Sequence, residues 1–190
     1  MFAIILYIII FVASILIAFI LNATLAVGMP VWYALVASVS NFAIIFALDT
    51  VVATIIHALP AKWFGPKKTS YKLTKGKKRF LKIIGVRTWK NLVPDMGKLC
   101  DFDRQELQST TDVKYIRKFL TETNYAQIIH ISMALIGFLD LLIWPSTELL
   151  NFSLPFAIFN FFINMPSIII QMYNRPRLYT LYKYALRHQN

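Results

Sequence analysis

Long runs of apolar residues divide the chain and predict helices that cross a membrane. Four such runs are present, at residues 2–26, 31–59, 125–144 and 152–173. A helix needs about 20 residues to cross the hydrocarbon core of a bilayer, so each run is long enough. The pattern predicts an all-α integral membrane protein with four transmembrane helices in a single domain, residues 1–190.

The first run is predicted to be a membrane span and not a cleaved signal peptide. Residues 2–26 carry no charged side chain and no basic start precedes them. The apolar part of a signal peptide is only about 7 to 15 residues long and follows a basic segment. Gly28, Met29 and Pro30 then predict a tight turn into the second run.

Positive charge is confined to the two polar segments, residues 61–124 and 174–190. Sixteen of the twenty Lys and Arg residues fall within residues 62–118, and the other four within residues 175–187. Basic residues beside membrane spans are typical of the cytoplasmic side, so both segments and both chain termini are predicted to be cytoplasmic. Within the first segment, residues 80–86 are apolar enough to lie against the membrane as a short amphipathic element.

Composition supports this class and excludes others. Hydrophobic residues make up 57% of the chain and the mean hydropathy is +0.57, values too apolar for a soluble domain. The net charge of +11 is clustered beside apolar runs, which favours membrane lipids over nucleic acid as the partner. The single cysteine, Cys100, excludes an intramolecular disulfide, and no Cys/His motif predicts a metal site.

Two acids and two amides lie inside the predicted spans. Asp49 precedes Leu59 by ten residues and so lies about 15 Å deep, near the bilayer midplane. Asn160 and Asn164 are four residues apart and share one helix face, where they are placed to meet Asp49. Whether Asp49 has a structural or a functional role stays open, whereas Asp140 is interpreted as structural.

The most informative stretch is residues 164–177, where an apolar span changes into a cluster of cations. Amides are costly in lipid without a partner, so Asn164 and Gln171 are predicted to face protein. Pro176 is predicted to end the helix. That end would leave polar side chains just outside the hydrocarbon, suited to phosphate or carboxylate recognition: Asn174, Arg175 and Arg177.

Two more polar clusters flank the third span. Arg87 and Lys90 surround an indole, Trp89, which is a side chain typical of the membrane interface. Thr111 and Asp112 are predicted to cap the helix that leads into the span. Glu122, Gln127 and His130 follow where hydrophobicity rises. For His130 the sequence leaves two interpretations open, a packed interfacial histidine or a catalytic base.

In their order and spacing, four segments resemble the glycosyl-4,4'-diaponeurosporenoate acyltransferase family of small bacterial membrane enzymes. They are residues 59–64, 86–90, 122–130 and 164–178. The resemblance implies transfer of a fatty acyl group from acyl-CoA or an acyl carrier protein to a sugar hydroxyl of a glycosylated carotenoid, with no cofactor. Gln127 stands where relatives have an acid, and Met172 where they tend to have arginine.

For this reaction, each polar cluster receives an expected role. His130 is expected to act as the general base, with Glu122 as the residue that orients it. Arg175 and Arg177 are expected to bind the donor phosphates, followed by Arg87 and Lys90. The remaining polar side chains are expected to line the site: Asn164, Gln171, Asn174, Gln127 and Asp49.

Three alternatives remain at this stage. Cys100 offers a nucleophile for a covalent acyl-enzyme, although direct transfer is preferred because no histidine is near it in sequence. A noncatalytic four-helix protein that binds anionic lipid or scaffolds other enzymes explains the basic segments equally well. Another small membrane transferase, such as a lipid methyltransferase, would use the same architecture with a different donor.

Overall fold

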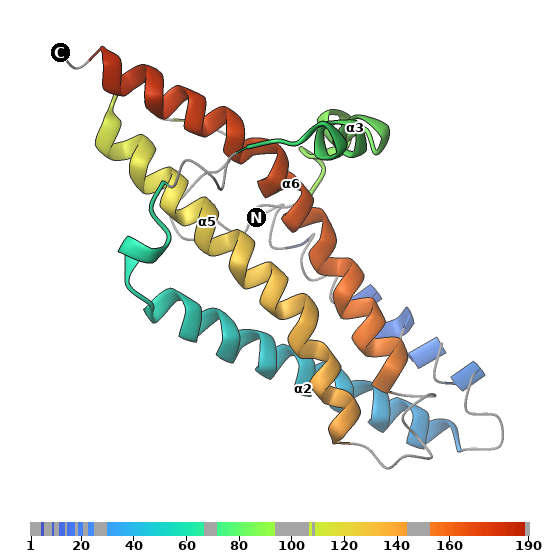
Figure 1. The fold of residues 1–190 in the computed structure, drawn as a ribbon. Helices are drawn as coiled ribbons and strands as arrows, with labels where there is room; N and C mark the ends of the chain where they lie inside the picture. Colours follow the sequence, from blue (N-terminus) through green and yellow to red (C-terminus); the bar gives the residue numbers. More distant parts are fainter. Residues whose placement is uncertain are drawn as a thin grey trace. The chain divides into compact units, whose positions relative to one another are not determined.

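A computed structural model describes most of the chain, and every regular element in it is helical (Figure 1). The described residues are 5, 9, 12–13, 15–17, 19–20, 23–24, 30–66, 72–93, 107, 109–143 and 153–188. They form α2 (Val31–Ala58), η1 (Ala61–Trp63), α3 (Lys75–Ile83), α4 (Val86–Trp89), α5 (Val113–Ile136), η4 (Gly137–Leu142) and α6 (Leu154–Arg187). The predicted all-α class is confirmed.

Three helical segments are long and apolar enough to cross a membrane. They are Val31–Ala58, Val113–Leu142, in which α5 continues into η4, and Leu154–Arg187. These match the second, third and fourth predicted spans. The first predicted span, residues 2–26, lies largely outside the described residues, as do Cys100 and the connection at residues 144–152.

The chain forms two compact units, each built from two sequence segments. Met1–Ile55 and Ile131–Met165 make one unit, which we call the apolar unit. Ile56–His130 and Pro166–Asn190 make the other, which we call the basic unit because it contains all twenty Lys and Arg residues of the chain.

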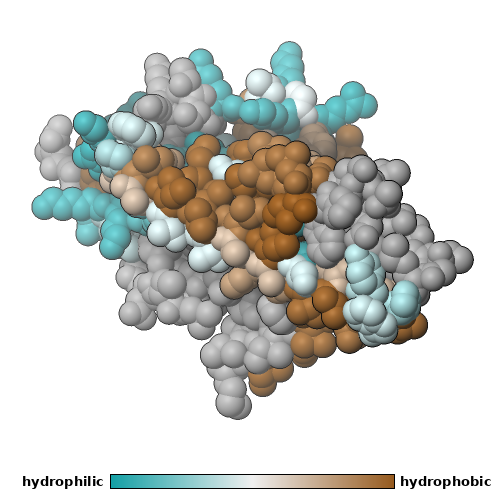
Figure 2. Space-filling view, turned by 90° about the horizontal axis from the view of Figure 1, so that it is seen from below, coloured by the Kyte–Doolittle hydropathy of each residue, from teal (hydrophilic) through white to brown (hydrophobic). Residues whose placement is uncertain are grey.

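In the apolar unit, α2 buries small and polar side chains and exposes large apolar ones. Its buried face follows a helical spacing of three to four residues: Ala34, Ala37, Ser38, Asn41 and Ile45. Its exposed face carries Trp32, Leu35, Val36, Val39, Phe46, Val51 and Ile55. This is the reverse of a water-soluble helix and is the pattern of a membrane helix, where small residues allow close packing and lipid covers the large ones. Brown, hydrophobic side chains also gather over a broad area of the face in Figure 2.

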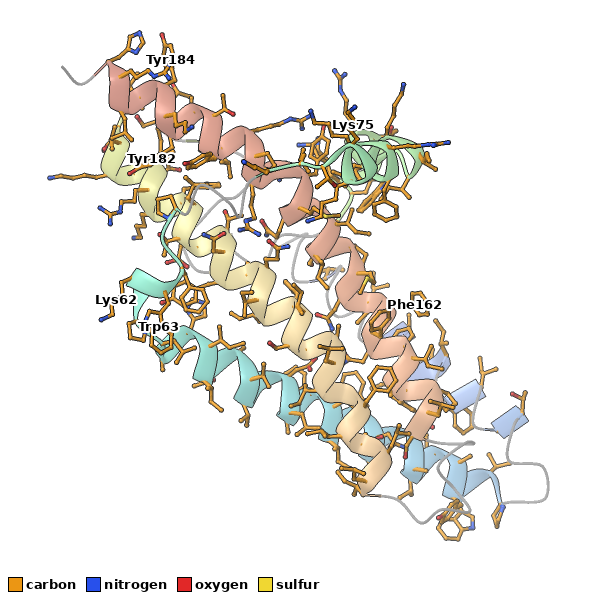
Figure 3. All side chains as sticks on the ribbon, viewed as in Figure 1. Lys62, Trp63, Lys75, Phe162, Tyr182 and Tyr184 are labelled. Carbon is orange, nitrogen blue, oxygen red and sulfur yellow. The ribbon has the colours of Figure 1, made fainter. Side chains whose placement is uncertain are left out.

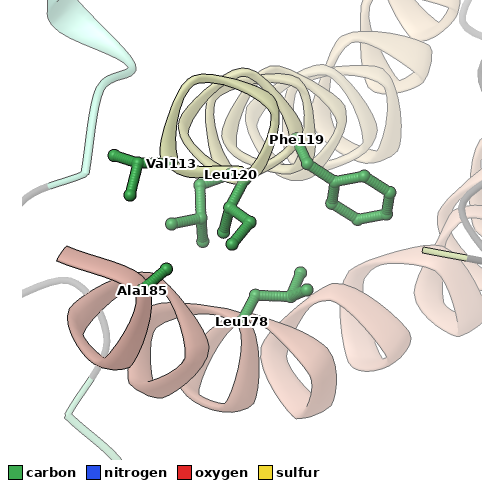
Figure 4. Packing of buried hydrophobic residues seen from close by; sticks show 6 residues of the cluster. Val113, Phe119, Leu120, Leu178 and Ala185 are labelled. Carbon is green, nitrogen blue, oxygen red and sulfur yellow. The ribbon is translucent and has the colours of Figure 1, made fainter. Parts of the chain in front are cut away.

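In the basic unit, α5 and α6 pack through a compact apolar core (Figure 4). The core consists of Val113, Ile116, Phe119, Leu120, Leu178 and Ala185. Figure 4 places Val113 near Ala185 and Leu120 near Leu178, so the two helices run antiparallel. Ile116 and Leu120 are fully buried. The predicted cap of α5 is confirmed for Asp112, whose Oδ1 accepts bonds from the amides of Lys114 and Tyr115 at 2.8 and 3.2 Å.

The prediction that Pro176 ends the helix is wrong, because α6 continues through Pro166 and Pro176 to Arg187. An interior proline costs about 3 kcal/mol, since its nitrogen donates no hydrogen bond and its ring crowds the preceding turn. Burial of Leu178 and Ala185 against α5 offsets that cost. Burying a large aliphatic side chain completely stabilises a fold by about 1.5–3 kcal/mol. Tertiary packing therefore extends the helix past its local stop signal.

The lysine-rich segment also forms more structure than the pattern indicated. The predicted amphipathic element at residues 80–86 is replaced by α3, which begins five residues earlier, and by the short α4. Thr74 caps α3 by accepting a bond from the Lys77 amide at 3.3 Å. Gly85 joins the two helices at φ 60°, a left-handed conformation that favours glycine. Trp89 Nε1 donates to Ile84 O at 2.8 Å and closes the corner between them.

Candidate functional site

The apolar unit contains a hydrogen-bonded chain of polar side chains. Asp49 on α2 is hydrogen-bonded to Asn160 on α6, as the sequence predicted. Asn160 Nδ2 also donates to Met133 O at 2.8 Å, and Asn164 Nδ2 donates to Asn160 Oδ1 at 3.1 Å. Asn160 and Asn164 are both buried. The chain joins three helices, so it satisfies amides that would be costly to leave unpaired in lipid.

A glycine makes room for this arrangement. A Cβ at Gly137 would lie 2.5 Å from Asn160 Nδ2 and 3.3 Å from its Cβ and Cγ. Any larger side chain at position 137 would therefore force Asn160 to shift. No sequence motif marks Gly137, so the sequence analysis missed its role.

In the basic unit, three aromatic rings hold the turn after α2 against α5. Tyr125 stacks on Phe64 at 3.9 Å between ring centroids and on His57 at 5.0 Å. The Tyr125 hydroxyl donates to Leu59 O, and Asn124 Nδ2 donates to Phe64 O, both at 2.6 Å. Figure 3 shows Lys62 and Trp63 side by side on this turn. The turn is thus fixed by hydrogen bonds from residues sixty or more positions away.

Two cations from distant segments meet on one tyrosine ring of the basic unit. The Arg177 guanidinium lies 3.7 Å from the centroid of the Tyr173 ring, and Lys90 Nζ lies 5.7 Å from it. Arg177 and Tyr173 are four residues apart and so share a face of α6, whereas Lys90 follows α4. The sequence analysis selected Lys90 and Arg177 but missed Tyr173, although the four-residue spacing was a usable signal.

The two arginines expected to act together lie on different sides of α6. Because the helix is continuous, positions 175 and 177 point about 160° apart around its axis. Arg175 is half-buried, on the side of the buried residues Gln171 and Leu178. Arg177 is exposed. The structure brings Arg177 together with Lys90 and does not form a joint Arg175 and Arg177 clamp.

The other expected site residues lie in the basic unit with varied exposure. Asn174 is half-buried on α6, and Arg87 is exposed on α4. On α5, Glu122, Gln127 and His130 are half-buried. Positions 123, 126 and 130 follow the spacing of one helix face, and Thr123 and Ala126 are buried, so His130 continues the buried face. Glu122 lies about 80° away from His130 around the axis.

Gln127 on α5 has a buried amide oxygen whose hydrogen-bonding capacity is unused. Gln127 Oε1 is buried and accepts no hydrogen bond from the described residues. A buried amide oxygen left unsatisfied costs about 1–3 kcal/mol, so a donor from a bound molecule would stabilise it. Within the ranges that the structure describes, no group of three or more His, Cys, Asp or Glu side chains is placed to hold a metal ion.

These features define an α-helical membrane protein with a candidate site for an anionic ligand. Three of its helices are apolar enough to cross a membrane, and the basic unit holds cations on an aromatic ring. Comparison with known proteins gives the family. A family model described as glycosyl-4,4'-diaponeurosporenoate acyltransferase matches residues 60–184.

Two similar proteins carry the same description, and both are from Staphylococcus aureus. The protein of strain MRSA252 is 30% identical over 155 residues, and that of strain N315 is 30% identical over 142 residues. In each case 72% of this chain and 82% of the relative are covered. The chain belongs to the glycosyl-4,4'-diaponeurosporenoate acyltransferase family, and it is an acyltransferase. No solved structure matches it significantly.

Proposed function

We propose that this protein transfers a fatty acyl group from a thioester donor to a sugar hydroxyl of a membrane glycolipid such as a glycosylated carotenoid. The observation that carries the proposal is the meeting of Lys90 and Arg177 on Tyr173, because both cations lie in the matched range of an acyltransferase family. Family membership favours this activity over a noncatalytic scaffold and over a methyltransferase.

The two cations supply a subsite for the phosphates of the donor. Acyl-CoA carries several phosphates and an acyl carrier protein carries one, and both attach the acyl group through a thioester. A guanidinium offers a planar fork of N–H donors to phosphate, and a lysine adds a compact charge. Tyr173 holds the guanidinium in place, at a cation–π gain of about 0.5–2 kcal/mol. Arg87 and Arg175 are further cations for the donor.

In the proposed reaction, His130 is the general base. The sugar hydroxyl oxygen attacks the thioester carbonyl and loses its proton to the neutral imidazole. The carbon–sulfur bond then breaks, and the departing thiolate takes the proton, so an ester and a thiol result. No cofactor is needed and no covalent acyl-enzyme forms. A neutral imidazole suits proton transfer near pH 7.

Polar side chains of the basic unit would hold the acceptor sugar and orient the base. Gln127 presents the buried acceptor Oε1, which suits a sugar hydroxyl donor. Gln171 and Asn174 are the corresponding groups on α6, and Glu122 assists His130. In the apolar unit, Asp49 and Asn164 belong to the hydrogen-bonded chain that joins the helices, and we assign them a supporting role.

The basic unit is proposed to lie on the cytoplasmic side of the bacterial cell membrane, with both termini there. All Lys and Arg residues belong to it, and positive residues beside spans are retained in the cytoplasm. Acyl-CoA and acyl carrier protein are made in that compartment, and a membrane glycolipid presents its sugar at the headgroup level.

The general-base assignment is tested with His130→Ala in purified protein, supplied with an acyl-CoA and a glycosylated carotenoid. We expect the rate of acylated product formation to fall by about 100-fold or more. His188→Ala is the matched control, because His188 is an exposed histidine at the end of α6 and should leave the rate unchanged. Full activity of a properly inserted His130→Ala protein would show that another group takes the proton.

A further inference from the structure

The face of α3 opposite its buried residue carries apolar side chains that the described residues leave largely exposed. Leu81 is the buried residue of α3, at 6% exposure. Ile83 lies about 160° from Leu81 around the helix and is 72% exposed, and Phe80 is 45% exposed. Leu92, just after α4, is 77% exposed. Large apolar groups gathered on one surface element indicate an interaction site.

The positive charge around this face favours an anionic partner. Residues 72–93 contain eight Lys and Arg residues and no Asp or Glu. Five of the eight cations lie in α3 itself: Lys75, Lys77, Lys78, Arg79 and Lys82. All five are exposed. On a helical projection, Arg79 lies on one side of the Phe80 and Ile83 pair and Lys77 on the other, so cations flank the exposed apolar side chains.

An apolar pair flanked by cations is the pattern of a helix that lies in the interface of an anionic bilayer. The apolar side chains enter the headgroup boundary to a depth of about 5–10 Å, while each nearby Lys or Arg gains about 1 kcal/mol from anionic lipid. Apolar spans of this same chain place such a bilayer next to the basic unit. A water-soluble partner would also have to supply acidic groups beside an apolar pocket.

The corner between α3 and α4 connects this face to the phosphate subsite. Gly85 permits the turn, Val86 is fully buried, and the indole of Trp89 donates back to Ile84 O. Lys90 follows directly and lies over Tyr173. Contact of α3 with the bilayer would therefore fix the height of Lys90 relative to the headgroups.

We propose that α3 is an interfacial helix that docks on anionic phospholipid through Phe80 and Ile83, with its lysines and arginine against lipid phosphates. The docking rests on the exposed face of α3 and does not depend on the acyl transfer reaction. The occupant of this face is the bilayer surface, and not a second protein.

The test places a fluorescent label at single cysteines in the full-length protein with Cys100 replaced by Ser. Ile83→Cys reports the apolar side of α3, and Lys78→Cys is the matched control, because it is exposed and lies about 140° away around the helix. The protein is reconstituted in vesicles of phosphatidylcholine alone or with phosphatidylglycerol. Quenching by aqueous iodide and by lipids with a nitroxide on the acyl chain is then measured.

We expect a label at position 83 to show a several-fold smaller iodide quenching constant than one at position 78, and to be quenched by the nitroxide lipid. The difference should grow with phosphatidylglycerol and decline when Lys77 and Arg79 are both replaced by Gln. Equal iodide quenching at both positions in both lipid mixtures would overturn the proposal and leave a protein partner to explain the face. Because the readout is depth and not product, it is independent of the proposed chemistry.

Discussion

At the scale of single residues, the aromatic side chains decide where polar groups are held. Lys90 and Arg177 both lie over the ring of Tyr173, and the ring of Tyr125 stacks on Phe64 and on His57. A ring gives each charged or polar neighbour a fixed surface at little cost in side-chain entropy, since it has only two rotatable bonds. Side chains from different segments are thereby held at defined positions.

Two substitutions at Tyr173 test the role of its ring separately from that of its hydroxyl. Tyr173→Leu should raise the KM for the acyl donor by about 2- to 30-fold, which corresponds to the loss of a cation–π contact of about 0.5–2 kcal/mol. Tyr173→Phe keeps the ring and should leave KM near that of the wild type. Steady-state kinetics with varied donor provide the measurement. A Tyr173→Leu protein with unchanged KM would remove this ring from the donor site.

Asp49 offers a second prediction at this scale. Asp49→Ala should lower the thermal stability of the detergent-solubilised protein more than Asp49→Asn does, because Asn still bonds to Asn160. A buried partner left unsatisfied costs about 1–3 kcal/mol. Thermal unfolding of the two variants measures the difference. Equal stability would mean that the bond to Asn160 contributes little.

At the scale of elements, packing overrules local signals in α6. Pro176 is a helix breaker by its covalent structure, yet the residues that follow it supply two of the six core residues in Figure 4. The consequence extends to the site, since a continuous helix turns Arg177 toward Tyr173 and Arg175 toward the side of Gln171. A break at position 176 would have left both orientations undetermined.

Two leucines of α6 test this packing by the same substitution. Leu178→Ala should destabilise the protein by about 2–5 kcal/mol, because Leu178 belongs to the buried core between α5 and α6, where it lies near Leu120. Leu186→Ala, at an exposed position of the same helix, should cost much less. Thermal or denaturant unfolding in detergent gives both values. Similar losses for the two variants would contradict the extended helix.

At the scale of the whole molecule, positive charge is confined to one part of the chain. Every Lys and Arg belongs to the basic unit, and the apolar unit holds none. Moving a charged side chain to the centre of a bilayer costs several kcal/mol, so this segregation sets the orientation of the protein in the membrane. It also brings most of the expected site residues into one unit.

Orientation is tested with single cysteines in a background without Cys100. Cysteines at positions 75 and 187 should be protected from a membrane-impermeant thiol reagent in intact cells, whereas one at position 147 should react. Permeabilised cells provide the control, in which positions 75 and 187 should also react. Labelling of position 75 from outside would reverse the proposed topology.

A structural feature can be predicted from the sequence when residues close to it in the chain determine it. Helical spans and the Asp112 cap follow from spacing and hydropathy, because those signals act within one or two helical turns. The bond between Asp49 and an amide is predicted from the similar depths of these residues in their spans. Gly137 and Tyr125 escaped notice because each is needed only by a residue from another element. The extent of α3 was missed because a run of lysines has low hydropathy, although each lysine is compatible with a helix.

By itself, the sequence determined that this chain is a helical membrane protein with its cations beside the spans, since hydropathy and charge position are properties of short segments. Tertiary structure alone decided that α6 passes Pro176, that Arg175 and Arg177 diverge, and that Lys90 and Arg177 meet on Tyr173. The physical reason is that these outcomes depend on packing between segments that lie far apart in the chain, and no local pattern records which side chains such packing brings together.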